Sequence, residues 1–129
     1  MTQNRYQAAI AAFDQANAED PNTEMADGKK YPKELLYAQR MSEMQERYAP
    51  GASEALKLAV RAQHIQRWKI PRGDYSMDKP GYMLWRTTLY KFHAGTAGNL
   101  IKEAGYDDNM IARVKNIVSK KELKTDPET

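Results

Sequence analysis

The chain contains two histidines, His64 and His93, and these are its best candidates for chemistry. A neutral imidazole can bind a transition metal, and a protonated one can attract an anion. Both residues fall on or beside the apolar side of a predicted helix, where the ring nitrogens need hydrogen-bond partners. The spacing leaves two interpretations open. Either each histidine is structural, or the two imidazoles converge on one divalent transition metal ion or one anion.

A metal ion would need more donors than these two rings. Transition metals in proteins usually have about four to six ligands. Between residues 57 and 102 the only carboxylates are Asp74 and Asp78, both near a predicted loop. We therefore expect a metal at His64 and His93 to take a carboxylate from another part of the protein.

The segment 61–75, RAQHIQRWKIPRGDY, is the densest in basic and aromatic side chains. Arginine can bind a phosphate with two parallel hydrogen bonds, and an adjacent aromatic ring can stack on a base. We predict Arg61, Arg67 and Arg86 as anion-binding residues and Trp68 as a residue that lines the pocket. The alternative is that Trp68 belongs to the core and the arginines to the surface.

The charge of the chain is concentrated in its middle. The formal net charge is +3, but residues 57–102 hold nine Lys and Arg and two Asp, a net of +7. A basic segment of this kind favours a small anionic ligand or RNA as partner. A solvated basic face is the alternative.

Five helices account for most of the chain. Apolar residues recur at helical spacing, and caps and prolines mark the ends. We predict helices over residues 4–18, 33–48, 53–68, 79–104 and 108–121. Residues 19–32 contain turn formers and are predicted as a loop. No segment shows the alternation of a strand, so we predict an all-α fold, a single compact bundle of about five helices over residues 1–129.

The same spacing predicts the buried side of each helix and its caps. The residues expected inside on the second, third and fourth helices are Leu36, Met41, Met44, Tyr48, Leu56, Val60, His64, Trp68, Tyr82, Trp85, Leu89, Phe92 and Thr96. His93 is expected on the flank of this side. Ser53, Asp78 and Asp107 are predicted N-caps, and Gly105 is a predicted C-cap.

Composition excludes several classes of site. The chain has no cysteine, which rules out disulfides, thiolate zinc sites and cysteine nucleophiles. No targeting signal is visible and no segment is apolar enough for a membrane span. We expect a cytoplasmic protein without a membrane partner.

The last residues, KTDPET, resemble the start of a helix. Asp126 would be its N-cap and Pro127 its first residue. We expect that the chain is truncated there and that further C-terminal helices are missing.

Five runs along the chain are specific in combination: NAEDPN, PKELLYAQRM, RAQHIQRW, GYMLWRTTLYKFHA and LKTDPE. Together they resemble the family catalogued as domain of unknown function 4202, over about residues 5–129. The resemblance implies no established activity. It implies a further helical stretch past DPE that bears a Glu-Asp pair.

A more distant resemblance is to HD-type phosphohydrolases, which are all-helical and bind metal through histidines and aspartates. AVRAQHIQRW resembles the segment around their central His-Asp pair, and FHAGTAGNLIKEAGYDDNMIARV resembles a later histidine helix. The resemblance implies an HD-like arrangement in which His64 and His93 hold the metal. Ile65 stands where the paired aspartate is expected. Tyr37 or Arg40 occupies the region of the first histidine, and both are expected to line the pocket.

Three hypotheses follow. The first is a degenerate HD-like, metal-dependent phosphohydrolase that acts on a small phosphorylated or nucleotide ligand. The second is a non-catalytic module that binds a nucleotide or RNA in the same basic pocket. The third is a helical interaction domain whose open face is covered by a partner or by a second copy of the chain.

Overall fold

The computed structural model describes the backbone of residues 2–119 and the side chains from residue 5 onward. The elements in chain order are α1 Thr2–Ala18, β1 Thr23–Ala26, β2 Lys29–Pro32, α2 Lys33–Tyr48, α3 Glu54–Ala62, the 3₁₀ turns η1 Arg67–Lys69 and η2 Arg72–Asp74, α4 Lys79–Ala104 and α5 Asp108–Val118. The predominantly all-α fold is therefore confirmed. The helix start predicted at Asp126 lies outside the described residues.

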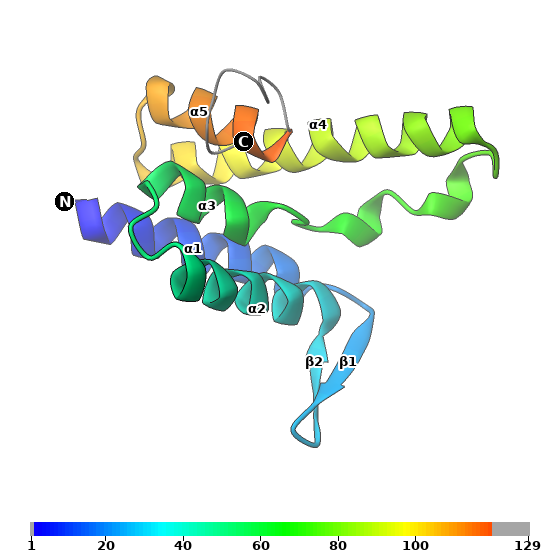
Figure 1. The fold of residues 1–129 in the computed structure, drawn as a ribbon, viewed down its shortest axis with the longest axis horizontal. Helices are drawn as coiled ribbons and strands as arrows, with labels where there is room; N and C mark the ends of the chain where they lie inside the picture. Colours follow the sequence, from blue (N-terminus) through cyan, green and yellow to red (C-terminus); the bar gives the residue numbers. More distant parts are fainter. Residues whose placement is uncertain (1, 120–129) are drawn as a thin grey trace.

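The long helix α4 organises the molecule (Figure 1). Helix α5 lies along the C-terminal half of α4, and α1 and α3 pack beneath the two of them. Helix α2 packs against α1 and α3. The N-terminal half of α4 extends beyond this body, and the segment 67–78 runs alongside it from the end of α3 out to the start of α4.

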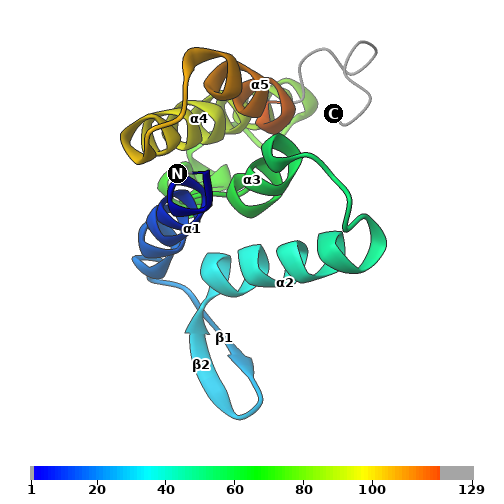
Figure 2. The same cartoon turned by 90° about the vertical axis from the view of Figure 1, so that its left-hand side faces the viewer.

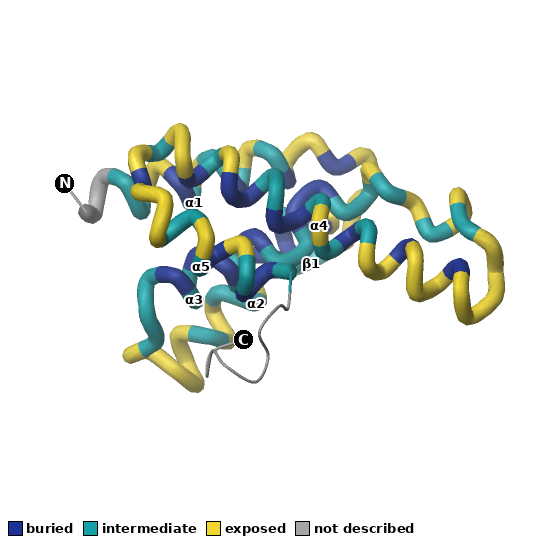
Figure 3. The backbone as a smooth tube through the Cα atoms, turned by 90° about the horizontal axis from the view of Figure 1, so that it is seen from above, coloured by how far each residue is buried: buried dark blue, intermediate teal, exposed yellow. Residues whose placement is uncertain are grey.

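The core is formed by α1, α3, α4 and α5, which contribute mainly small and aliphatic side chains. Its largest fully buried apolar residues are Phe13, Leu58, Ile65, Ile101 and Val114. Alanines fill the spaces between them and allow the helix axes to approach closely. The projecting end of α4 contributes few buried positions, as the exposed stretch of the tube in Figure 3 shows. None of the helices in the described part of the chain is long and apolar enough to cross a membrane.

The predicted helix caps are confirmed. The side chains of Ser53, Asp78 and Asp107 accept hydrogen bonds from backbone N–H groups in the first turn of α3, α4 and α5 respectively. Gly105 ends α4 in the left-handed conformation, with φ of 107°. These caps satisfy backbone groups that the helices leave without a partner.

The expectation of a loop without strands over residues 19–32 is wrong. β1 and β2 form an antiparallel hairpin that projects from the helical body (Figure 2). Asp27 and Gly28 form its turn with φ of 51° and 77°, the left-handed pair that matches the twist of a hairpin. Asp-Gly is a strong local signal for such a turn, whereas the strands have little apolar alternation because most of their residues are exposed.

The predicted third helix is too long at its C-terminal end. Helix α3 ends at Ala62, and Gln66 adopts a left-handed conformation with φ of 53°. The buried positions of α3 are Ala55, Leu58, Ala59 and Ala62. The face predicted from Leu56, Val60, His64 and Trp68 is therefore wrong. The helix packs mainly through alanines, which a search for large apolar residues at helical spacing does not detect.

The faces predicted for α2 and α4 also need correction. Met44 and Tyr48 are 53% and 76% exposed, since the C-terminal half of α2 extends past the core. On α4 the buried line runs through Trp85, Leu89 and His93, so His93 lies within the buried face and not on its flank. Three residues predicted inside are not buried: Tyr82 is exposed, and Phe92 and Thr96 are half-buried.

Candidate anion-binding site

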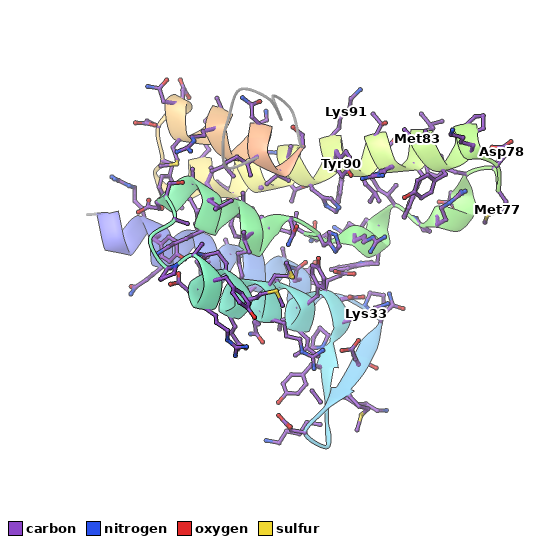
Figure 4. The ribbon with its side chains drawn as sticks, in the orientation of Figure 1. Lys33, Met77, Asp78, Met83, Tyr90 and Lys91 are labelled. Atoms are coloured by element: carbon purple, nitrogen blue, oxygen red, sulfur yellow. The ribbon has the colours of Figure 1, made fainter. Side chains whose placement is uncertain are left out.

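A pocket of about 250 Å³ lies where the end of α3 and η1 approach α4. From the α3–η1 connection it is lined by Gln63, His64 and Arg67, and from α4 by Tyr82, Trp85, Arg86, Leu89, Tyr90 and His93. Figure 4 shows Tyr90 on the stretch of α4 that runs above the 67–78 segment. No Asp or Glu of the described chain is among the lining residues, so the ionisable groups that line the pocket are basic or phenolic.

The structure brings the two histidines together. The ring centroids of His64 and His93 are 6.0 Å apart. His93 is buried, and its Nδ1 lies 2.9 Å from the carbonyl oxygen of Ile65. Because a carbonyl can only accept, Nδ1 carries the proton, and Nε2 is the acceptor atom of the neutral ring.

His64 stacks on Tyr37, with ring centroids 4.3 Å apart and an angle of 5° between the planes. Tyr37 therefore lies behind His64 and does not line the pocket itself. The His64 Nδ1 lies 3.8 Å from Oε1 of Glu34, whose pKa is raised by burial. Burial also raises the pKa of the Tyr37 hydroxyl. The carboxyl group of Glu34 thus lies close to the His64 ring but does not line the pocket.

Two of the three predicted anion-binding arginines line the pocket. The guanidinium of Arg67 lies 5.3 Å from the centroid of the Trp85 ring. Arg86 donates from Nε to the hydroxyl of Tyr90 at 2.5 Å, a contact that raises the pKa of Arg86. An arginine has five donors, so each guanidinium has donors beyond these contacts to offer an anion.

Two hydrogen bonds, one buried and one partly buried, position the segment that carries His64 and Arg67. The side-chain oxygen of Asn17, in α1, accepts from the backbone N–H of Gln66 at 2.9 Å. The indole N–H of Trp85 donates to the carbonyl of Ile70 at 2.8 Å and so ties the segment to α4. Gln66, held at the first of these anchors, is left-handed and turns the chain out of α3 and toward α4.

The structure does not bring three other predicted residues to the pocket. Arg61 makes two hydrogen bonds, at 2.9 and 2.7 Å, to the carboxylate of Asp14. Arg40 pairs with Glu24 of the hairpin at 2.8 Å. Trp68 lines a neighbouring groove instead of this pocket. Arg61 and Trp68 are close to His64 along the chain, but their position in the sequence does not determine which part of the fold each side chain contacts.

The metal site expected at the histidines is not complete in the described residues. Two ring nitrogens, each about 2 Å from an ion, could share it at the observed separation. However, the described residues contain no group of three His, Asp or Glu side chains arranged to hold a metal. The two arginines that line the pocket would also oppose a second positive charge there. The donors present do not fit a transition metal, and we derive no chemistry through one.

Five residues of the pocket were missed as site residues: Gln63, Tyr82, Trp85, Leu89 and Tyr90. The two tyrosines carried a usable signal. They lie four residues before and after Arg86, a spacing that places all three on one side of α4. Tyr82 was expected on the buried side of its helix, although it is exposed.

The comparison with known proteins gives a family and nothing more. No curated protein and no solved structure matches the chain. One family model matches residues 7–129, and its description is domain of unknown function (DUF4202). Because this match covers nearly all of the sequence, the chain belongs to that family, as its five sequence motifs had indicated.

Proposed function

We propose that this protein binds a small phosphorylated ligand in the pocket between α3, η1 and α4. One observation carries the proposal: two arginines and two histidines line the same 250 Å³ pocket, and no carboxylate of the described chain lines it. Phosphate is the biological anion that takes several charge-assisted hydrogen bonds at once. A pocket of this size suits a phosphate group of a small molecule better than a strand of RNA.

Each basic group has a distinct part in this proposal. Arg67 and Arg86 would hold the phosphate oxygens from opposite sides of the pocket, one from η1 and one from α4. The tyrosine that accepts from Arg86 restrains its guanidinium, which reduces the entropy lost on binding. His93 is fixed by its bond to Ile65, so its ring keeps one orientation at the pocket, and protonation of this ring would add a positive charge there.

Binding without catalysis is better supported than metal-dependent hydrolysis. The hydrolase hypothesis needs a carboxylate to complete the metal site, and no Asp or Glu of the described residues lines the pocket. The binding hypothesis needs only residues that already line the pocket. The described residues therefore favour an anion-binding module, with phosphoester hydrolysis as an activity to assay on the same protein.

Titration calorimetry with inorganic phosphate at low ionic strength tests this proposal. We expect wild-type binding that weakens with salt, because the pocket attracts the anion by charge. Arg67→Gln and Arg86→Gln should each weaken binding by about ten-fold, the usual cost of losing a hydrogen bond to a charged group. Arg47→Gln removes the same charge from the exposed end of α2 and should leave the affinity unchanged. Absence of binding, or equal losses in all three variants, would contradict the proposal.

A second candidate function is protein association through the projecting end of α4. Three large apolar side chains are exposed there: Met77 by 75%, Met83 by 49% and Leu84 by 60%. Exposed apolar side chains that cluster in this way often mark an interaction surface. Figure 4 shows Met77 and Met83 at the end of α4 farthest from the core. Light scattering of the wild type and of Leu84→Asp tests for self-association, and a monomer in both samples would remove a second copy as the partner.

A further inference from the structure

A second concavity adjoins the phosphate pocket. It is a groove of about 520 Å³ between the base of the hairpin, the start of α2 and the segment 67–72. The groove and the pocket have two lining residues in common, Arg67 and Trp85. The two spaces therefore meet at Arg67 and Trp85, whose guanidinium and ring lie 5.3 Å apart.

The chemistry of the groove differs from that of the pocket. Its apolar surface comes from Pro21, Trp68, Ile70, Pro71 and Trp85. Three cations rim this surface, Lys33, Arg67 and Arg72, against the single buried carboxyl group of Glu34. Figure 4 shows Lys33 at the base of the hairpin, on the far side of the groove from α4. Apolar walls with a basic rim fit the organic part of a negatively charged ester.

The two tryptophans of the groove differ in burial and in the groups that contact their rings. Trp85 is buried, donates its indole N–H to Ile70, and lies within 5.8 Å of the guanidinium groups of both Arg67 and Arg72. Trp68 is half-buried and, among the described residues, has neither a ring nor a guanidinium stacked on it. A large aromatic surface beside positive charge and without a stacking partner suits a flat ring, which gains about 1–3 kcal/mol by stacking.

We propose that the ligand is a phosphate ester with a flat aromatic group, a nucleoside monophosphate being the biological example. The phosphate lies in the pocket on Arg67 and Arg86, and the ring stacks on Trp68 in the groove. This inference rests on the proposed function, since the phosphate site fixes the ligand next to the groove. Arg67, which lines both spaces, contacts the ligand where its two parts join.

A series of ligands with one phosphate group tests this proposal on the wild-type chain. Methyl phosphate, phenyl phosphate and adenosine 5′-monophosphate present the same anion with and without a ring. We expect the two aromatic esters to bind between about five-fold and 150-fold more tightly than methyl phosphate, the range that stacking energies give. This comparison needs no variant, so it does not depend on the folding of a mutant protein.

Variants of Trp68 assign the preference to the groove. In Trp68→Ala the advantage of the aromatic esters should disappear while the affinity for methyl phosphate stays the same. Trp68→Phe retains a stacking surface and should keep part of the advantage. Equal affinities for methyl and phenyl phosphate in the wild type would overturn the inference and leave the phosphate pocket standing. Failure of all four anions to bind, inorganic phosphate included, would overturn the proposed function itself.

Discussion

The side-chain oxygen of Asn17 accepts a hydrogen bond from the backbone N–H of Gln66 across 49 positions of sequence. Both residues are buried. The bond joins the last turn of α1 to the left-handed residue that separates His64 from Arg67. A polar residue in the core thus holds the turn on which the pocket depends, since the helix that carries the preceding residues has already ended.

Replacement of Asn17 by alanine is expected to damage both stability and binding. The buried N–H of Gln66 would lose its acceptor, which costs about 1–3 kcal/mol of unfolding free energy. Phosphate affinity should fall as well, because the turn no longer fixes His64 and Arg67. Urea denaturation and calorimetry measure the two effects. Gln15→Ala, an exposed change in the same helix, should alter neither. A fully stable Asn17→Ala protein would show that the turn is held by other contacts.

Arg61 is expected to contribute to stability and not to binding. Its two hydrogen bonds to Asp14 join α3 to α1, and its side chain is only 16% exposed. Arg61→Gln should lower the unfolding free energy by about 1–2 kcal/mol, because a half-buried carboxylate loses its partner. Phosphate affinity should not change, in contrast to Arg67→Gln.

A double-mutant cycle with Asp14→Asn separates the Arg61–Asp14 pair from other contacts of the two residues. The double variant should lose less stability than the sum of the two single variants. Weaker phosphate binding in Arg61→Gln would restore Arg61 to the site that its position in the sequence had suggested.

The caps and the charge of the site were predictable, whereas the faces of the helices were not. A cap depends on one side chain and a backbone N–H three residues away, as at Ser53 and Leu56. It can therefore be predicted from a few neighbouring residues of the sequence. The buried side of a helix depends on what packs against it. Helix α3 packs through Ala55, Ala59 and Ala62, and alanines give almost no hydrophobic pattern.

The site shows the same division between local and long-range information. His64 and His93 lie close together, which agrees with one of the two interpretations that their spacing left open, although His64 was expected within a helix and lies after the end of α3. Arg61 and Arg67 lie six positions apart, yet one pairs with α1 and the other lines the pocket. Which partner each takes is decided by the left-handed turn at Gln66, and no rule of spacing predicts such a turn in a residue other than glycine.

Two glycines of α4 are expected to respond in opposite ways to alanine. A β-carbon at Gly81 would lie 2.1 Å from the backbone oxygen of Ser76, so the turn that leads into α4 must move. Gly81→Ala should cost about 1–3 kcal/mol, as overpacking does. A β-carbon at Gly95 has no atom within 4 Å, and Gly95→Ala should gain about 0.5–1 kcal/mol from helix propensity.

Thermal and urea denaturation of the two glycine variants check this contrast. Because Gly81 precedes Tyr82 and Arg86 in the same helix, the Gly81 variant should also bind phosphate more weakly. Equal stability of the two variants would mean that the segment before α4 adjusts without strain.

The carboxyl group of Glu34 is expected to make stability depend on pH. Burial raises its pKa, Arg67 opposes the rise, and Asp20 adds to it. In the unfolded chain the pKa of a glutamic acid side chain is about 4.3. Between that value and the raised pKa the folded protein binds more protons than the unfolded protein, so this group makes stability fall as pH rises through the window.

Glu34→Gln removes this ionisation while retaining the shape of the side chain. At pH 4, where Glu34 is largely neutral, the variant and the wild type should have similar unfolding free energies. At pH 7 the variant should be the more stable of the two, because it avoids the loss of stability that the wild type undergoes as the pH rises through this window. Urea denaturation between pH 4 and 8 measures the difference, with Glu43→Gln as the exposed control on the same helix. A variant that is less stable at pH 7 would show that the contact with His64, 3.8 Å away, outweighs the cost of burial.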